Sequence, residues 1–223
     1  AQACRLPYEL QNKALQKSLP SPGDHLLSPQ DLCTVDRVDD LVAAGVASLK
    51  IEGRMKSPEY VYAVTSAYRA ALDRVLAARD AARESGLQDW TAPGGTEQEH
   101  AQLAEAFSRG FTTAYLEGKR GNEIMSYGRP NNRGVFIGRV ASVKNGKAAV
   151  ACERPIVAGD VLEFWTNKGH FAYTVSQVDT DRNGNLLLAP ERAVGKGDRV
   201  FRVRSAEAAF VDDDRLPRIQ VQG

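Results

Sequence analysis

The sequence predicts a chain of mixed α+β or α/β class, with a partial barrel-type α/β unit that has long helices, followed by a small antiparallel β-barrel. Apolar residues recur every three to four positions from residue 58 to about residue 82, which indicates a long amphipathic helix. After residues 129–134 the pattern changes to short apolar runs separated by turn dipeptides, which is typical of a small barrel. We therefore divide the chain into residues 1–128, a barrel domain at 129–205 and a tail at 206–223.

The first half of the chain is expected to contain mostly helices. Residues 1–30 are rich in proline and predict irregular structure, with strand-like residues only at 8–10 and 26–27. The expected elements that follow are a short helix from Thr34 or Asp36 to Gly45, a buried strand at 46–52, the long helix that starts at Ser57 and Pro58, a second helix at 97–109 and a helical turn at 113–116.

The second half of the chain is expected to contain strands. Turn dipeptides such as Asn145-Gly146 and Asn183-Gly184 separate the apolar runs and predict hairpins. The six runs that we interpret as strands are residues 135–143, 147–152, 160–165, 171–178, 186–188 and 199–203.

The composition is that of an ordinary globular chain. Of the 223 residues, 43% are hydrophobic and 26% are charged, and the formal net charge is +1. This balance gives no overall electrostatic signal for nucleic acid or for an anionic membrane, although it is compatible with a local basic groove. Because no apolar run approaches the roughly 18 residues that span a bilayer, we expect no membrane association.

The cysteines and the first residues indicate where the protein resides and how much of it is present. Three cysteines, an odd number in a long chain, argue against a disulfide framework and favour the cytoplasm. The chain starts at Ala1 without an initiator methionine or a signal peptide, so we expect it to be the C-terminal portion of a longer protein.

Four charged residues crowd the junction between the predicted strand and the long helix, namely Lys50, Glu52, Arg54 and Lys56. In α/β sheets and barrels, ligands bind beyond the carboxyl ends of the strands. Lys50 and Glu52 alternate with apolar neighbours, so both are expected to point into a barrel or a crevice. Burying either charge alone costs several kcal/mol, which favours pairing with each other or with a ligand. A structural ion pair explains this local pattern as well as a ligand site does.

A longer stretch around this junction resembles a known family. Residues 47–61 read ASLKIEGRMKSPEYV and resemble a segment that recurs in the U32 peptidase family, the collagenase-like proteases. Other similar stretches are AQACRLPY at 1–8, LSPQDLC at 27–33, SRGFT at 108–112 and RPNNRG at 129–134. Together the similar stretches extend over residues 1 to about 205.

The resemblance implies a barrel-like α/β catalytic domain followed by a helical segment and a small β-barrel. Several relatives are oxygen-independent hydroxylases of ribosomal RNA, transfer RNA or a quinone precursor, and they hold an iron-sulfur cluster on four cysteines. The full-length protein is therefore implied to be an enzyme, a peptidase and hydrolase by family name but an iron-sulfur-dependent hydroxylase of transfer or ribosomal RNA by resemblance. We expect this chain alone to be inactive and to bind no cluster.

The resemblance also assigns roles to individual residues. Cys4 matches a cysteine of the family pattern Cys-Ala-Gln-Pro-Cys-Arg, with alanine here in place of proline, and Cys33 matches the cysteine of Ser-Pro-Lys-Asp-Leu-Cys. Both are implied cluster ligands in the full-length protein, although two thiolates cannot hold a cluster that requires four. The other implied roles are catalysis for Lys50, Glu52 and Arg54, and substrate binding for Arg5, Lys56, Arg129 and Arg133.

One alternative interpretation is a genuine protease of unknown mechanism. The sequence gives it no independent support, because His25, His100 and His170 lie outside any recognisable nucleophile motif. A metalloprotease of the His-Glu-x-x-His type is not indicated, because no such run occurs.

Another alternative is a non-catalytic module that binds RNA or a protein partner. Cations and aromatic rings of the predicted barrel are suited to RNA, and they are Arg129, Arg133, Arg139, Lys144, Lys147, Lys168, Phe136, Trp165 and Phe171. We favour the simpler interpretation that the rings fill the barrel and the cations are solvated, because acidic residues dilute the basic stripe. Cys152, in an apolar run, is likewise interpreted as a core residue. The sequence identifies no protein partner.

Overall fold

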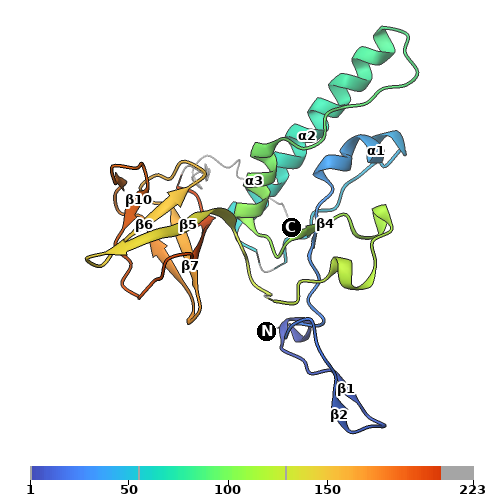
Figure 1. Cartoon of the computed structure of the whole chain (residues 1–223). Coiled ribbons are helices and arrows are strands. Elements are labelled where there is room, and N and C mark those ends of the chain that lie inside the picture. The colour runs from blue at the N-terminus through green and yellow to red at the C-terminus, as the bar shows by residue number, and fades with distance from the viewer. Residues whose placement is uncertain (1, 55, 129, 207–223) are drawn as a thin grey trace, which may run out of the picture.

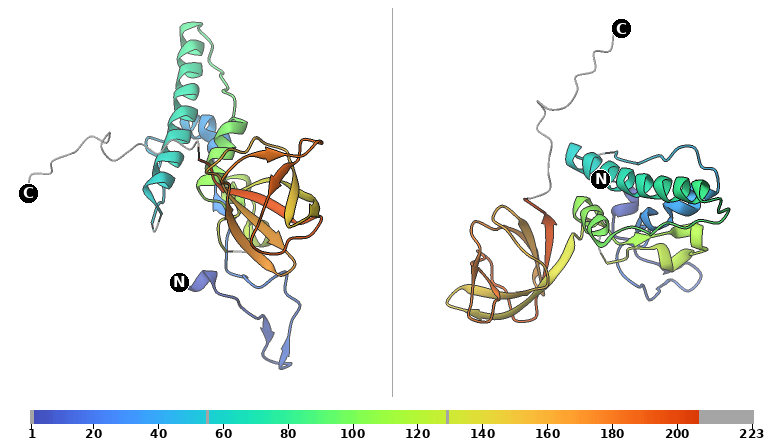
Figure 2. Two further views of the ribbon diagram at one scale, coloured as in Figure 1. Left: turned by 90° about the vertical axis from the view of Figure 1, so that its left-hand side faces the viewer. Right: turned by 90° about the horizontal axis from the view of Figure 1, so that it is seen from above.

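The computed structural model describes residues 2–54, 56–128 and 130–206 (Figure 1). A mainly helical part comes first and a seven-stranded sheet follows, and Figure 2 shows the two lying side by side. The helices are η1 (Ala3–Arg5), η2 (Val35–Arg37), α1 (Val38–Ala43), α2 (Pro58–Glu84), α3 (Glu97–Ala106), η3 (Ala114–Glu117) and η4 (Gly121–Ile124). The strands are β1 (Gln11–Asn12), β2 (Lys17–Ser18), β3 (Asp31–Leu32), β4 (Phe111–Thr112), β5 (Val135–Lys144), β6 (Lys147–Cys152), β7 (Val161–Thr166), β8 (Gly169–Thr174), β9 (Asp179–Thr180), β10 (Leu186–Leu188) and β11 (Arg199–Arg204).

The long helix α2 confirms the predicted periodicity. The Ser57 hydroxyl accepts a hydrogen bond from the Tyr60 backbone N–H at 3.4 Å, and proline occupies the first helical position, where no hydrogen bond is lost. Small and β-branched residues form the buried face of α2, which packs against α1 and α3 and helps to form one of the two hydrophobic cores. The buried members of this core are Val35, Val38, Val64, Ala67, Ala71, Val75 and Leu103.

Helix α3 is shorter than predicted and is anchored firmly at its start. Thr96 and Glu99 form a capping box, in which each side chain accepts a hydrogen bond from the other residue's backbone N–H. Glu99 also receives both terminal nitrogens of Arg74 from α2 at 2.9 Å. The helix ends at Ala106 because Phe107 adopts an extended backbone, three residues before the expected stop.

The prediction of a buried strand at residues 46–52 is wrong. This segment has no regular secondary structure, and within it only Ile51 is partly buried. A strand needs a hydrogen-bonded neighbour, and within the described residues none runs beside this segment. Val46 and Leu49 instead line an apolar groove between α1 and α2.

The pairing inside the helical part is between two very short strands. β3 and β4 run parallel, with Asp31 opposite Phe111 and Leu32 opposite Thr112. Their pairing joins segments that are about 80 positions apart in the chain. The strand-like residues predicted at 8–10 and 26–27 do not form strands, and the β1–β2 hairpin lies between them and projects from the rest of the chain (Figure 1).

The second half of the chain forms one antiparallel sheet with the strand order β8-β7-β11-β5-β6-β10-β9. Each of the six predicted runs contains a strand, although β8 ends at Thr174 and leaves residues 175–178 of its predicted run outside any strand. β9 was missed because it contains only two residues. The last strand, β11, lies between β7 and β5, so the end of the described chain closes the middle of the sheet. Among the described residues no pairing joins the outer strands β8 and β9, so the closed barrel stays a prediction.

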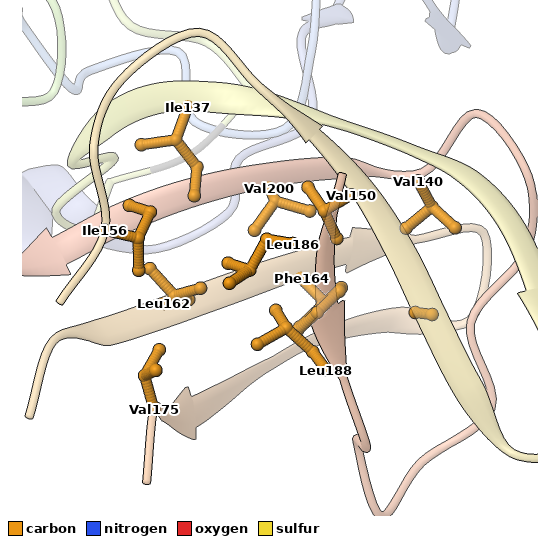
Figure 3. Packing of buried hydrophobic residues seen from close by; sticks show 11 residues of the cluster. Ile137, Val140, Val150, Ile156, Leu162, Phe164, Val175, Leu186, Leu188 and Val200 are labelled. Atoms are coloured by element: carbon orange, nitrogen blue, oxygen red, sulfur yellow. The ribbon is translucent and has the colours of Figure 1, made fainter. Parts of the chain in front are cut away.

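The sheet encloses its own apolar core, shown in Figure 3. Phe164 of β7 and Val200 of β11 are fully buried there, with Ile137 of β5 and Leu188 of β10. Two ion pairs join the sheet to α3: Arg202 donates through Nε to Glu105 at 3.0 Å, and Arg154 pairs with Glu97 at 3.0 Å. No helix among the described residues is long and apolar enough to cross a membrane.

The proposed division of the chain into domains remains a prediction. The change from helix to strand occurs near its boundary, since β5 begins at Val135. Of the tail predicted at 206–223, only Ala206 belongs to the described residues.

Candidate functional site

The candidate site is built around the β3–β4 pair. Asp31 starts β3, and its carboxylate accepts the backbone N–H of Arg109 at 2.8 Å and the Nε–H of Arg109 at 3.2 Å. Arg109 Nη2 completes a two-pronged ion pair with the same carboxylate. The side chains are only 21% and 15% exposed, so this pair is largely sheltered from water and fixes both groups.

Lys56 extends over the same site from the turn before α2. Its Nζ lies 2.7 Å from the centroid of the Phe107 ring and 5.3 Å from that of Tyr60. Burial lowers the pKa of Lys56 from 10.5 to about 8; Asp31 opposes this shift, while Arg109 and Arg5 add to it. Lys56 is therefore a cation that loses its proton as the pH rises through about 8.

Arg5 and Arg133 reach the site through two serines. Arg5 Nη1 donates to the Ser28 hydroxyl at 2.5 Å and to the Pro29 carbonyl at 3.3 Å. The Ser28 carbonyl accepts the backbone N–H of Ser126 at 2.7 Å, and the Ser126 hydroxyl accepts Arg133 Nη2 at 2.8 Å. Burial, followed by the charge of Arg109, lowers the pKa of Arg5. Its buried Nε has no hydrogen-bond partner within the described residues.

We call Arg5, Lys56, Arg109 and Arg133 the cation cluster. Within it, the charge of Arg109 lowers the pKa of both Arg5 and Lys56, and the charge of Asp31 raises both. Three cations therefore share one carboxylate. A half-buried surplus of guanidinium and ammonium groups with an unused N–H is suited to a phosphate or another anion.

Three of the predicted substrate-binding residues, Arg5, Lys56 and Arg133, meet in this cluster although they are far apart in the chain. The fourth, Arg129, lies outside the described residues. Asp31, Phe107 and Arg109 were not singled out from the sequence. Asp31 and Arg109 lie inside the stretches LSPQDLC and SRGFT that resembled the family, but spacing alone did not show that these stretches meet.

The three residues predicted to be catalytic lie outside the cation cluster. Lys50, Glu52 and Arg54 are exposed, so the prediction that Lys50 and Glu52 point into a crevice is wrong, because no sheet covers their segment in the part of the chain described here. Glu52 reaches the rim of the cluster: its carbonyl accepts the Tyr60 hydroxyl at 3.2 Å, and its carboxylate accepts the Arg54 backbone N–H at 3.3 Å. Whether the three act in catalysis stays a prediction.

The cysteines differ in their surroundings. Cys33 follows β3, its backbone N–H bonds to the Thr112 carbonyl at 2.9 Å, and burial raises the pKa of its thiol. Cys4 lies in η1 and is partly buried next to Arg5. Cys152 packs partly buried against the core of the sheet, where burial raises the pKa of its thiol to about 11, in line with its interpretation as a core residue.

Cys4 and Cys33 do not make a complete iron-sulfur site. Across the described ranges, no three His, Cys, Asp or Glu side chains are grouped so that they could hold a metal ion. A cluster requires four ligands, most often thiolates, and Cys4 and Cys33 are only two. The residues of this chain therefore do not fit a whole cluster by themselves, and no chemical step is derived through one.

Comparison with known proteins adds a family to this geometry. The family described as peptidase family U32 matches residues 1–126. The chain is 36% identical over 192 residues to the 23S rRNA 5-hydroxycytidine C2501 synthase of Escherichia coli strain K12, covering 85% of this chain and 28% of that protein. It is 34% identical over 141 residues to a collagenase of Porphyromonas gingivalis strain W83, covering 62% of this chain and 31% of that protein.

Another relative is also named for RNA modification. The tRNA hydroxylation protein P of Haemophilus influenzae is 28% identical over 184 residues, covering 80% of this chain and 36% of that protein. The chain spans about a third of the length of the curated relatives that it matches. No solved structure gives a significant match.

Proposed function

Because the chain belongs to peptidase family U32, we propose that it is part of an RNA-hydroxylating enzyme that acts on ribosomal or transfer RNA. The observation that carries this proposal is the extent of similarity to the relatives named for RNA modification. The match to the rRNA-modifying relative covers 85% of the chain, so it includes most of the strand-rich residues 135–204 as well as the family region at 1–126. The match to the collagenase covers 62%.

In this proposal the cation cluster holds a phosphate group of the RNA. The ammonium group of Lys56 is available to donate to phosphate oxygens, while Asp31 holds Arg109 in a fixed orientation beside it and Arg5 adds positive charge. Phosphate contacts of this kind position a nucleic acid without reading its sequence. The identity of the modified base is then set by contacts other than these.

Lys56 is the group of the cluster that is suited to moving a proton. With a pKa of about 8, it is mostly protonated at neutral pH and still gives up its proton at little cost. We assign it the role of proton donor or acceptor at the edge of the phosphate site. The backbone carbonyl of Glu52 accepts the hydroxyl of Tyr60, whose ring lies beside Lys56, and the side chain of Glu52 is the proposed catalytic carboxylate. Lys50 and Arg54 lie on the same exposed segment.

An iron-sulfur cluster belongs to the proposal only for the full-length protein. Cys4 and Cys33 would supply two of its ligands, and a bound cluster would supply electron transfer. We expect anaerobically purified full-length protein to contain iron and acid-labile sulfide, and a Cys33→Ser variant to contain much less of both. Protein that contains neither, with no visible absorption, would remove the cluster from the account.

The direct test of the function is nucleoside mass spectrometry of ribosomal and transfer RNA. In the native host, deletion of the gene should abolish one hydroxylated nucleoside, and expression of the full-length protein should restore it. An unchanged set of nucleosides in both RNA classes after deletion would contradict the proposal. A cytoplasmic location, where these RNAs are found, is part of the same proposal.

A second candidate function is proteolysis, which the name of the collagenase relatives favours. Among the described residues His100 pairs with Asp36 at 2.9 Å on an exposed surface, and His170 lies 3.7 Å from Glu163. Neither arrangement includes a serine or cysteine nucleophile. Gelatin cleavage by the purified full-length protein that disappears in the Glu52→Gln variant would support this second function in place of the first.

A further inference from the structure

The outer face of the sheet carries an ordered set of aromatic and basic residues. Strand pairing places Arg199 of β11 opposite both Trp165 of β7 and Arg139 of β5. In the next row on the same face, Phe201 of β11 lies opposite Phe136 of β5. Trp165, Arg199 and Phe201 alternate along β7 and β11 with the core residues Phe164 and Val200, so they lie on the face that points away from the core. On β5 the strand irregularity opposite Val200 and Phe201 brings both Arg139 and Phe136 to this outer face.

The core contents confirm this assignment. Leu162, Phe164 and Val200 fill the interior, together with other aliphatic side chains (Figure 3). The earlier interpretation that the aromatic residues fill a barrel is therefore wrong for Phe136 and Trp165, which belong to the opposite face. It is right for Phe171, which packs against this core and stacks on Phe164 at 5.3 Å between ring centroids.

The three outer rings form a continuous row. The ring centroids of Trp165 and Phe201 are 4.4 Å apart, and those of Phe201 and Phe136 are 5.5 Å apart. All three side chains are partly exposed. Three adjacent, partly exposed rings on a strand surface provide apolar surface on which nucleobases can stack.

Two exposed arginines flank the row. The guanidinium carbon of Arg199 lies 4.9 Å from the Trp165 ring and 5.8 Å from the Phe201 ring, and that of Arg139 lies 5.9 Å from the Phe136 ring. The two arginines are cross-strand neighbours, and like charges in that position repel each other. Within the described residues, neither forms an ion pair with a carboxylate.

Glu163 of β7 lies on the same face, opposite Phe201, and among the described residues it forms no ion pair with either arginine. Glu163 is only 8% exposed, and its carboxylate accepts the indole N–H of Trp165 at 3.1 Å. On its other side Glu163 lies 3.7 Å from His170. Within the part of the chain that the structure describes, the positive charge of Arg139 and Arg199 therefore stays available to an external anion.

We propose that this surface, which we call the aromatic–arginine face, is a docking site for an unpaired segment of RNA. It comprises Phe136, Arg139, Trp165, Arg199 and Phe201. The inference rests on the proposed RNA function and adds a second, separate contact surface to it. Bases stack on the three rings, and phosphates lie against the two arginines. An unpaired segment is required, because the base faces of a duplex are already stacked on one another.

The test uses this chain with a fluorescently labelled, unstructured RNA oligonucleotide and measures binding by anisotropy over a range of salt concentrations. A variant with Arg139→Ala and Arg199→Ala should bind roughly tenfold more weakly or worse. Its salt dependence should flatten by about 0.7 in the log–log slope for each lost phosphate contact. The matched control, Lys144→Ala with Lys147→Ala, removes two exposed cations from the far end of β5 and its neighbour β6, and should change affinity less than about threefold.

A second measurement reports stacking directly. The chain has two tryptophans, so a Trp90→Phe variant leaves Trp165 as the single tryptophan emitter. Unpaired RNA should quench this emission, and a duplex of the same sequence should quench it much less.

Equal losses in the arginine and lysine variants, or unquenched Trp165 emission at saturating RNA, would overturn the docking site. Absence of RNA binding by the unmutated chain would also overturn it. Each of these results leaves the hydroxylated-nucleoside test untouched, so failure of the docking site and failure of the proposed function are distinguishable.

Discussion

Lys56 has the most informative chemistry of any residue in the site. It is partly buried against Phe107, near Arg5 and Arg109, and its pKa falls to about 8 mainly because of burial. As pH rises through that value, the cluster loses a positive charge. Because a bound anion interacts favourably with the charged form, it also draws the pKa of Lys56 upward.

A pH titration of anion binding follows from this. We expect sulfate, whose charge is constant above about pH 4, to bind the chain less tightly as pH rises through about 8 and above. A Lys56→Arg variant should keep its affinity across this range, because a guanidinium group stays charged. Calorimetric titration at several pH values measures both. The same pH dependence in the variant would show that Lys56 is not the group responsible.

The pair of Asp31 and Arg109 predicts a stability effect at the same scale. Asp31→Asn leaves a mostly buried guanidinium without its charged partner, so the free energy of unfolding should fall by about 2 to 3 kcal/mol. The matched control is Asp73→Asn, which removes an exposed partner of Arg69 on α2 and should cost about 0.5 kcal/mol or less. Urea denaturation measures the difference, and equal costs would contradict the structural role of Asp31.

At the scale of elements, a few residues of β structure assemble the site. β3 and β4 have two residues each, yet their pairing brings Asp31 and the following Cys33 beside the segment that carries Arg109. Such short strands leave no pattern of alternation in a sequence, so the pairing was not predictable. The long, capped helix α2 was predictable, because its signals are local: a serine N-cap, a proline at the first position and a regular apolar stripe.

The large sheet depends on a glycine in β5. Gly138 has φ +152°, and a Cβ atom there would lie 1.9 Å from the carbonyl oxygen of Ala151 on β6. Gly138→Ala should therefore cost about 3 kcal/mol or more, because the β5–β6 pairing must shift. Gly146→Ala, in the turn of the same hairpin with no neighbour within 4 Å, should cost only about 1 kcal/mol.

Thermal or urea unfolding of the two alanine variants measures this contrast. Similar losses for Gly138→Ala and Gly146→Ala would mean that the close approach of β5 and β6 is not needed for stability. We expect both variants to fold and Gly138→Ala to be the less stable of the two.

At the scale of the whole molecule, the sequence predicted the order of elements better than their arrangement. The change from a helical to a strand period near residue 134 located the sheet, because each period is a local property. Whether residues 46–52 form a strand depends on a neighbouring strand, which no local pattern reveals. Lys50 and Glu52 are exposed for the same reason, because no neighbouring strand covers their segment in the described part of the chain.

The candidate site was predictable only in part. The family resemblance selected Arg5, Lys56 and Arg133, which the fold brings together, but not Asp31, the carboxylate that organises them. The aromatic–arginine face was misjudged, because the inward or outward direction of Phe136 and Trp165 depends on strand register and on the irregularity between Val200 and Phe201. In our proposals, two positively charged surfaces, one in each half of the molecule, contact the RNA.

The account depends most on the cation cluster serving RNA hydroxylation. The most direct measurement is the amount of the hydroxylated nucleoside in cells that lack the native gene and express the full-length protein with Lys56→Gln or, as a control, Arg69→Gln. We predict that Lys56→Gln lowers the nucleoside at least about tenfold and that Arg69→Gln, on the exposed face of α2, restores it fully. Full restoration by the Lys56→Gln protein at equal abundance would contradict the account.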